Sequence, residues 1–311
     1  MRLSFMGTPA FALPSLRALV DAGHEICLVV TRPDRPAGRG RRVAPPPVKL
    51  AAQGLKLPIL QPERMGEPGV VAALRAARPE AIIVVAYGQL LPEAILALPP
   101  QGCLNLHASL LPKYRGPAPI PWAIIRGEMV TGVTIMRIEA RLDAGGIVLQ
   151  RAEPIGPRDT AGTLGERLAM LGAELLCQAL DQAARGTARL IPQDEGLVTY
   201  APKLTPEDTH LDWARDAHAL DRLIRGLHPK PGAVSRFGGR RVKILEALVE
   251  APPDAPPGAV LAIDRDRGVL VATGRGGLRL TRVQPENRRA MSAAEFARGY
   301  RVQPGDIFGP S

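Results

Sequence analysis

The amino-acid sequence predicts an α/β domain with a parallel-rich sheet, followed by a small antiparallel β-barrel domain. In the amino-terminal part, short apolar runs alternate with segments of helical periodicity, which is typical of βα units. Beyond residue 208, short strand-like segments follow one another closely, with Gly, Pro and Asp between them, which is typical of a small barrel. The chain of 311 residues is long enough for two domains. We therefore predict a first domain over 1–189, a linker over 190–207 and a second domain over 208–311.

The first domain begins with a strand over residues 2–6, and Thr8 and Pro9 are predicted to be the N-cap and the first residue of the helix that follows. Residues 81–85 form a nearly continuous apolar run, which indicates a central strand covered on both faces. Further strands are predicted at 27–30, 57–60, 132–137 and 147–150, and helices at 48–53, 70–77, 120–126 and 164–186. In the second domain we predict a helix at 217–226 and strands at 241–248, 258–263, 268–272 and 277–283.

The basic charge of the chain is concentrated in one loop. The formal net charge is +10, and residues 32–49 alone carry six basic side chains against one acidic side chain. Residues 31–47 are so rich in Pro and Gly that we predict a long exposed loop without helix or strand. A basic loop followed by a basic second domain favours a phosphate-rich partner. A solvated linker that happens to be basic is the alternative.

A strand that ends at His107 carries the most informative polar residues. Asn105 and His107 are two positions apart, so their side chains leave the same face of an extended strand. Ser109–Pro112 then turns the chain away, at the edge where open parallel sheets bind ligands. The loop 86–92 leaves its own strand at that edge, so we expect the two loops to form one crevice. From these residues alone, a backbone-bridging Asn105 and a hydrogen-bonded structural His107 remain an alternative.

Several other classes of site are disfavoured. The turn after the first strand has one glycine, Gly7, where a dinucleotide site has G-x-G-x-x-G. The three cysteines are scattered and the five histidines show no metal-ligand spacing, which indicates free thiols and no metal. No run approaches the roughly 18 apolar residues of a membrane span, and the chain starts with a strand pattern instead of a targeting peptide. We therefore expect a soluble, cytoplasmic protein without membrane contact.

The chain also contains an ordered set of motifs: Met6–Pro9 (MGTP), Thr31–Gly40 (TRPDRPAGRG), Val84–Gly88 (VVAYG), Asn105–Pro112 (NLHASLLP), Arg115–Ile120 (RGPAPI), Thr131–Met136 (TGVTIM), Leu142–Asp143 and Ala290–Ala293 (AMSA). In this set the chain resembles, over essentially its whole length, the methionyl-tRNA formyltransferase family. The Asn, His and Asp alone would identify only the wider folate-dependent formyltransferase group. The arginine loop and the second domain resemble the members that modify tRNA.

The resemblance implies transfer of a formyl group from 10-formyltetrahydrofolate to the α-amino group of methionyl-initiator tRNA, in translation initiation. It also implies a Rossmann-like formyltransferase domain and an OB-like barrel that carries part of the tRNA, and we expect a monomer. Asn105, His107 and Asp143 would form the catalytic group. Arg39 matches the loop arginine that engages the acceptor stem, with Arg41 and Arg42 beside it. The implied folate-binding residues are Val85, Ala86, Tyr87, Gly88, Leu90, Ser109, Leu110, Leu111 and Pro112.

The physical chemistry agrees with this assignment. Acyl transfer to an amine passes through a tetrahedral intermediate, so the site needs donors for an oxyanion and a route for the surplus proton of the amine. An Asn amide and a His on one strand face supply donors, and Asp143 on a neighbouring loop can orient the imidazole and help to relay the proton. No Ser or Cys has the features of an activated nucleophile.

One loop departs from the family pattern. The family usually has Gly-Leu-Asp-Thr-Gly-Asp where this chain has Arg141 to Gly146, so Arg141 replaces a glycine and Gly146 replaces the second acid. The alternatives are a formyltransferase that acts on a nucleotide-linked amino sugar, which needs no basic loop, and a non-catalytic tRNA-binding protein, which binds tRNA without turnover.

Overall fold

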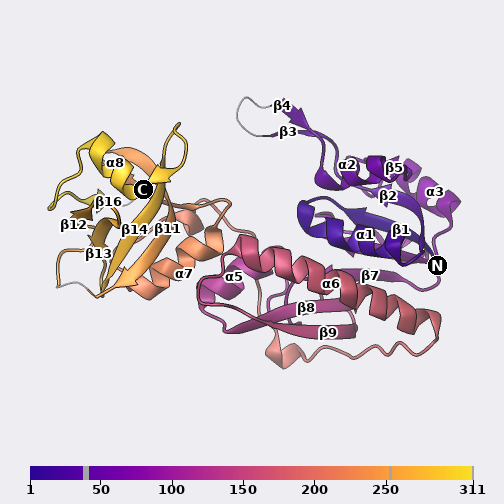
Figure 1. The fold of residues 1–311 in the computed structure, drawn as a ribbon. Coiled ribbons are helices and arrows are strands. Elements are labelled where there is room, and N and C mark those ends of the chain that lie inside the picture. Colours follow the sequence, from indigo (N-terminus) through magenta and orange to yellow (C-terminus); the bar gives the residue numbers. More distant parts are fainter. Residues whose placement is uncertain (38–41, 252–253, 310–311) are drawn as a thin grey trace. The chain divides into compact units, whose positions relative to one another are not determined.

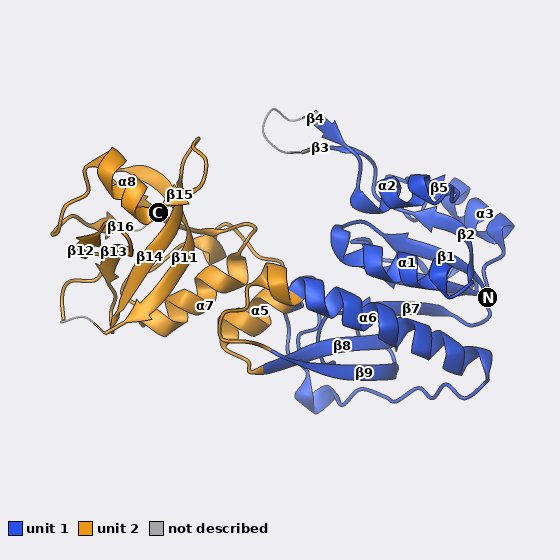
Figure 2. Ribbon diagram, in the orientation of Figure 1, with its two compact units in different colours: residues 1–119, 130–154, 165–202 blue, residues 120–129, 155–164, 203–311 orange. Residues whose placement is uncertain are grey.

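The computed structural model describes residues 1–37, 42–251 and 254–309. The chain folds into two compact units (Figure 2). Unit 1 comprises residues 1–119, 130–154 and 165–202, and unit 2 comprises residues 120–129, 155–164 and 203–311. The chain therefore enters unit 2 at two short segments before its carboxyl-terminal part, a crossing that no sequence pattern indicates.

Unit 1 is built on a seven-stranded sheet with the order β5-β2-β1-β6-β7-β8-β9 (Figure 1). Neighbours from β5 to β7 are parallel, and β8 and β9 extend the sheet in antiparallel fashion. The predicted parallel-rich sheet is thus confirmed. The strands are β1 (Arg2–Gly7), β2 (Glu25–Val30), β5 (Ile59–Leu60), β6 (Ala81–Val85), β7 (Cys103–His107), β8 (Val130–Arg137) and β9 (Ile147–Pro154).

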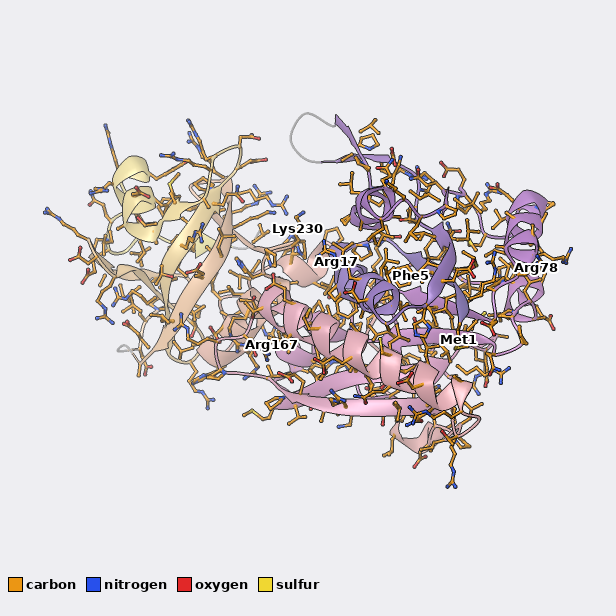
Figure 3. All side chains as sticks on the ribbon, turned by 45° about the vertical axis from the view of Figure 1, so that its right-hand side comes forward. Met1, Phe5, Arg17, Arg78, Arg167 and Lys230 are labelled. Carbon is orange, nitrogen blue, oxygen red and sulfur yellow. The ribbon has the colours of Figure 1, made fainter. Side chains whose placement is uncertain are left out.

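The helices of unit 1 are α1 (Leu13–Asp21), α2 (Pro47–Gly54), α3 (Pro68–Ala77), α4 (Glu93–Leu96) and α6 (Ala161–Ala184), with short 3-10 turns η1 (Ala10–Ala12) and η2 (Glu195–Leu197). They lie between the strands of the sheet along the chain, except that α6 and η2 follow the last strand, β9. Figure 3 shows the resulting distribution of side chains: Phe5 on β1 is fully buried inside unit 1, whereas Arg78 at the end of α3 is exposed.

Helix α6 packs closely on one face of β7. A Cβ atom on Gly172 would lie 2.3 Å from Leu106 Cδ1, so only a glycine permits this approach. Leu106 points toward the helix, and its neighbours Asn105 and His107 therefore point to the opposite face of the strand. The alternation along β7 separates the packing face from the polar face.

Unit 2 is a curled antiparallel sheet with the order β12-β13-β14-β11-β10-β16, and β15 pairs with β14. Its two ends are joined by backbone hydrogen bonds, including Val260 N to Asp306 O and Phe308 N to Gly258 O, both 2.8 Å. This closure is the small barrel that the sequence predicts. The strands are β10 (Ala233–Phe237), β11 (Arg240–Glu250), β12 (Val260–Asp264), β13 (Gly268–Ala272), β14 (Gly277–Pro285), β15 (Met291–Ser292) and β16 (Phe308–Gly309). The helices are α5 (Pro119–Arg126), α7 (Ala217–Leu227) and α8 (Ala293–Tyr300), with a 3-10 turn η3 (Glu207–Thr209).

Aromatic rings form part of the core of unit 2. Phe308 packs against Trp213, Phe237 and Phe296, with ring centroids 5.0 to 6.3 Å apart. The indole N–H of Trp213 donates to Ser235 Oγ at 2.9 Å, so burial of this ring leaves no unpaired donor.

Two local predictions are wrong. The loop 31–47 contains a short antiparallel hairpin, β3 (Arg35–Ala37) and β4 (Arg42–Ala44), because proline is tolerated in short, isolated edge strands. Thr8 does not cap a helix: its hydroxyl donates to the Tyr87 oxygen at 3.2 Å, and the η1 turn precedes α1. The tertiary hydrogen bond therefore overrides the local capping signal.

The prediction for unit 2 lacks β10, α8 and the two-residue strands β15 and β16. The signal for α8 is present in the sequence, because Ser292 and Glu295 form a capping box at its start.

Candidate active site

The sheet of unit 1 brings two of the predicted loops to one edge. β6 and β7 are parallel neighbours with Val85 opposite Leu106, so the loops that follow them leave the sheet side by side. Two residues of the predicted site have left-handed φ angles, Ala86 at 48° and Asp143 at 49°, and so does the nearby Tyr114 at 62°. Such conformations cost free energy and persist where the surrounding structure imposes them, often at functional sites.

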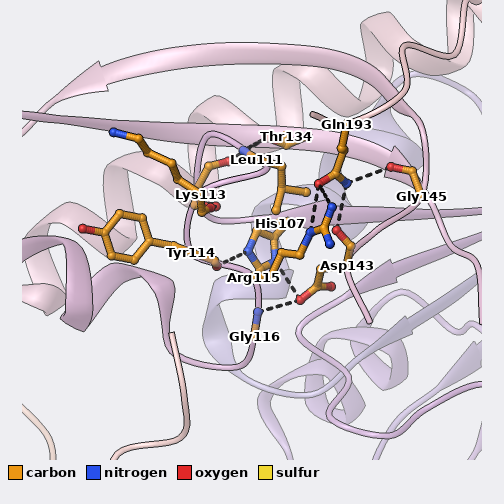
Figure 4. Close-up of polar contacts among 11 residues, drawn as sticks. His107, Leu111, Lys113, Tyr114, Arg115, Gly116, Thr134, Asp143, Gly145 and Gln193 are labelled. Carbon is orange, nitrogen blue, oxygen red and sulfur yellow. Dashed lines mark hydrogen bonds and ion pairs between the residues drawn. The ribbon is translucent and has the colours of Figure 1, made fainter. Parts of the chain in front are cut away.

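His107 and Asp143 face each other at this edge (Figure 4). His107 is 6% exposed, and its Nε2 lies 2.9 Å from the backbone oxygen of Tyr114. Because a carbonyl oxygen can only accept, Nε2 carries a proton. Nδ1, the other ring nitrogen, lies 3.8 Å from Asp143 Oδ2.

The Asp143 carboxylate is held in place by backbone. The Gly116 N–H donates to Asp143 Oδ2 at 2.8 Å, and the Asp143 side chain is 12% exposed. The loop that carries it returns tightly onto β8, since a Cβ atom on Gly145 would lie only 1.9 Å from the Arg137 oxygen. The contact at Gly145 therefore fixes the position of the loop and of the Asp143 carboxylate that it carries.

Asn105 lies on β7 between Val84 of β6 and Met136 of β8, on the same face as His107. Within residues 1–37, 42–251 and 254–309, no protein group hydrogen-bonds to its side-chain amide. The amide is thus not a bridge between backbone segments, and its donors are available to a bound molecule.

The predicted folate-binding side chains differ in what they contact. Tyr87 is 2% exposed, its hydroxyl donates to Met65 Sδ at 3.0 Å, and burial raises the pKa of its phenol to about 12. The Ser109 hydroxyl donates to the Lys113 oxygen at 2.6 Å, whereas Leu90 is 75% exposed. Of the others, Val85 and Leu111 are buried, and Ala86, Gly88, Leu110 and Pro112 are partly or fully exposed. The two loops therefore offer an exposed apolar side chain and backbone, and no ionisable group among the predicted residues except the buried Tyr87.

The predicted tRNA-binding residues fall, in the sequence, between the end of β3 and the start of β4. Arg39 and Arg41 fall outside the described residues, and Arg42 begins β4. The base of the hairpin is fixed at Asp34, which accepts hydrogen bonds from Gln61 Nε2 at 2.8 Å and Lys49 Nζ at 2.6 Å.

Sequence reasoning missed a second segment of the site, residues 191–201, because it resembled a linker. Its backbone pairs with other segments of unit 1, at Ile191 with Ile147 and at Tyr200 with Arg115. Gln193, within this segment, donates to the Asp143 and Gly145 oxygens, both at 2.8 Å. The segment has no periodicity that could reveal this role, and its prolines suggest a connector.

Comparison with known proteins identifies the family. A family model described as formyl transferase matches residues 1–180, and a model of the formyl transferase C-terminal domain matches residues 203–301. A methionyl-tRNA formyltransferase of Moorella thermoacetica is 48% identical over 310 residues, and one of Pelotomaculum thermopropionicum is 47% identical over 311 residues. Each alignment covers 99% of both proteins. The chain belongs to the methionyl-tRNA formyltransferase family.

Solved structures of other proteins share the fold. HypX from Aquifex aeolicus, solved with tetrahydrofolic acid, aligns with a TM-score of 0.69 at 21% identity. That alignment covers 99% of this chain and 50% of the longer HypX chain. The sugar 3N-formyl transferase WlaRD aligns with a TM-score of 0.65 at 17% identity and covers 93% of this chain and 99% of its own.

The structure accommodates both departures from the methionyl-tRNA formyltransferase pattern. Arg141 is 69% exposed and its guanidinium lies 2.9 Å from Glu195 Oε2, so it adds an ion pair at the surface of the loop. A Cβ atom on Gly146 would lie 3.1 Å from Leu190 Cβ, which is a close approach. Asp143 faces His107 despite both changes.

Within the described part of the chain, no helix combines the length and the apolar character needed to cross a membrane. Among the same residues, no group of three or more His, Cys, Asp or Glu side chains is arranged to hold a metal ion.

Proposed function

We propose that this protein transfers a formyl group from 10-formyltetrahydrofolate to the α-amino group of methionyl-initiator tRNA, in support of translation initiation. The single observation that carries the mechanism is the buried His107–Asp143 pair, 3.8 Å apart, beside the unpaired amide of Asn105. Identity of 47% and 48% to relatives named methionyl-tRNA formyltransferase supports the choice of substrate.

In the proposed reaction, the methionyl amine attacks the formyl carbon and a C–N bond forms. Negative charge develops on the formyl oxygen, where the Asn105 amide and the protonated Nδ1 of His107 donate hydrogen bonds. The Asp143 carboxylate receives the surplus proton of the amine and passes it to the leaving nitrogen of the folate as the old C–N bond breaks. The Gly116 N–H holds this carboxylate throughout, at 2.8 Å.

The formyl donor is proposed to lie over the loops that follow β6 and β7. A flat heteroaromatic ring binds through apolar contact and a few backbone hydrogen bonds. The exposed side chain of Leu90 and the backbone around Gly88 fit such a ring, since a Cβ atom on Gly88 would have nothing within 4 Å. The buried Tyr87 would contribute through its backbone, because its hydroxyl is bound to Met65.

The tRNA is proposed to bind through Arg39, Arg41 and Arg42 and through the barrel of unit 2. The net charge of +10 supports a polyanionic partner. We further propose that residues 1–189 carry the chemistry, that 190–207 connect them to a tRNA-binding domain over 208–311, and that the protein acts as a cytoplasmic monomer.

The direct test is to incubate the protein with 10-formyltetrahydrofolate and methionyl-initiator tRNA and to measure formyl-methionyl-tRNA beside an Asp143→Asn control. We expect product from the wild type and a collapse of turnover in the control. Tight tRNA binding without product from the wild type would contradict the proposal and favour a non-catalytic tRNA-binding protein.

A further inference from the structure

The Asp143 loop is held from a second side, and we propose that Gln193 is a positioning residue for formyl transfer. Gln193 bridges the buried guanidinium of Arg115 to the backbone of Asp143 and Gly145. The bridge sets the Asp143 carboxylate against His107. This inference rests on the proposed function, because it assigns a role within the same site.

Both the oxygen and the nitrogen of the Gln193 side-chain amide make hydrogen bonds (Figure 4). Its Oε1 accepts from Arg115 Nε at 3.0 Å and from a terminal nitrogen of Arg115 at 2.8 Å. Its Nε2 donates to the Asp143 and Gly145 oxygens, both at 2.8 Å. A guanidinium only donates and a carbonyl only accepts, so a flipped amide would oppose donor to donor and acceptor to acceptor. The orientation of the amide is therefore fixed by its partners.

Arg115 provides a rigid base for this bridge. Its side chain is 1% exposed and also pairs with Glu195 at 3.0 Å. Its backbone N–H donates to Thr199 O at 2.9 Å, and its oxygen accepts from Ala201 N at 2.7 Å. A buried guanidinium is tolerated only where its donors are satisfied, so displacing it is costly.

Three consecutive residues serve both members of the His107–Asp143 pair. The Tyr114 oxygen fixes Nε2 of His107, and the Gly116 N–H holds the Asp143 carboxylate. The Arg115 side chain, through Gln193, holds the backbone of Asp143. Loss of the Gln193 N–H donors would leave the carbonyl oxygens of Asp143 and Gly145 without these hydrogen bonds. The contact of the Gly116 N–H with the carboxylate would remain. The carboxylate would then be free to shift relative to the imidazole. Even a small shift would slow proton transfer, because catalysis depends strongly on the distances between reacting groups.

The test is Gln193→Glu, which keeps an acceptor for Arg115 but replaces the two donors with a carboxylate oxygen that repels both carbonyls. We expect kcat to fall about 10- to 100-fold, with KM for tRNA and for the folate within about twofold of wild type. The matched control is Gln101→Glu, which introduces the same charge at an exposed position and should keep the wild-type kcat. An unchanged kcat for Gln193→Glu, or a rise in KM alone, would overturn the inference.

A double-mutant cycle separates positioning from a general structural role. In an Asp143→Asn background, Gln193→Glu should have little further effect on the single-turnover rate, because the group that it positions is gone. A full additional loss in that background would overturn the inference. If the background rate is too low to measure, the division between kcat and KM decides.

Two further controls keep the outcomes distinct. Thermal unfolding monitors whether Gln193→Glu folds. If it does not, Gln193→Asn replaces it, because this variant has the same amide on a shorter side chain. The same fall in kcat is expected for Gln193→Asn, and an unchanged kcat would equally overturn the inference. A wild type that forms no formyl-methionyl-tRNA would contradict the proposed function itself. Normal wild-type turnover with a fully active Gln193→Glu would contradict the Gln193 inference alone.

Discussion

The described residues of the His107–Asp143 site and of the β3–β4 hairpin differ in burial and in how many contacts hold them. At the site, His107 is 6% exposed, and contacts from two segments, 114–116 and the one that carries Gln193, fix the imidazole and the Asp143 loop. On the hairpin, Arg35 and Val43 are about two-thirds exposed, and the contacts with the rest of unit 1 lie near its base, at Asp34 and at the exposed ion pair of Arg35 with Glu63. The difference matches what each region is proposed to do. Proton transfer needs fixed distances, whereas attraction of a polyanion depends mainly on the number and sign of charges.

His107→Ala is expected to have the largest effect, because it removes the proposed hydrogen-bond donor to the formyl oxygen from the rigid region. We expect kcat to fall about 100- to 10,000-fold, with tRNA affinity nearly unchanged. Steady-state formylation and a filter-binding assay of tRNA measure the two quantities. A comparable loss of tRNA affinity would show that the two regions are not separate in function.

Gly145→Ala tests whether activity depends on the position of the loop backbone, because it changes none of the proposed catalytic side chains. The added Cβ would meet the Arg137 oxygen at 1.9 Å, so the loop must move and carry Asp143 with it. We expect kcat to fall about 10- to 100-fold and the free energy of unfolding to fall by about 1–3 kcal/mol. Gly69→Ala on α3, where nothing lies within 4 Å of the new Cβ, is the control and should keep kcat without lowering the free energy of unfolding. Equal activity of the two variants would contradict a rigid loop.

Arg39→Ala tests the hairpin. We expect productive tRNA binding to weaken several-fold and the slope of log affinity against log salt to fall by about 1, with kcat at saturating tRNA preserved. Arg75→Ala, an exposed arginine on α3, removes the same charge elsewhere in unit 1. The same salt slope for Arg39→Ala and wild type would mean that this arginine contacts no phosphate.

Each region has one acidic residue whose stabilising effect depends on pH. Hydrogen bonds, chiefly that from Arg115, lower the pKa of Glu195 from its ordinary value of 4.5, and hydrogen bonds, chiefly that from Gln61, lower the pKa of Asp34 from 3.8. Because both folded values lie below the unfolded ones, the stabilisation is complete above the unfolded pKa and is lost as pH falls through the folded pKa. Thermal unfolding of Glu195→Gln and Asp34→Asn should therefore differ from wild type at neutral pH and converge with it in acid. A difference that does not change with pH would contradict this.

Arg141→Gly, which restores the usual family residue, is expected to have the smallest effect. The Arg141–Glu195 pair is mostly exposed, and such pairs contribute about 0–1 kcal/mol. We expect kcat within about twofold of wild type and a small, salt-dependent change in thermal stability. A large loss of kcat would show that Arg141 belongs to the rigid region after all.

The amount that the sequence could predict also differs between the two regions. The placement of Asn105 and His107 on one face of β7 follows from strand alternation, and strand periodicity placed β6 and β7 correctly. The meeting of His107 with Asp143 was suggested only by the family resemblance, because no local rule relates residues in different loops. Gln193 was missed since its role depends on long-range hydrogen bonds made by a segment without periodicity. The hairpin was missed because Pro36 and the glycines argue locally against a strand, whereas the pairing of β3 with β4 permits one.

The most direct test of this division of roles is the single-turnover rate of formyl transfer at saturating methionyl-initiator tRNA and folate, measured for wild type, His107→Ala and Arg39→Ala. We predict that Arg39→Ala reaches the wild-type rate, since excess tRNA compensates for weaker binding, and that His107→Ala stays about 100-fold or more below it. A wild-type rate for His107→Ala, or a rate for Arg39→Ala that saturation does not restore, would contradict the account.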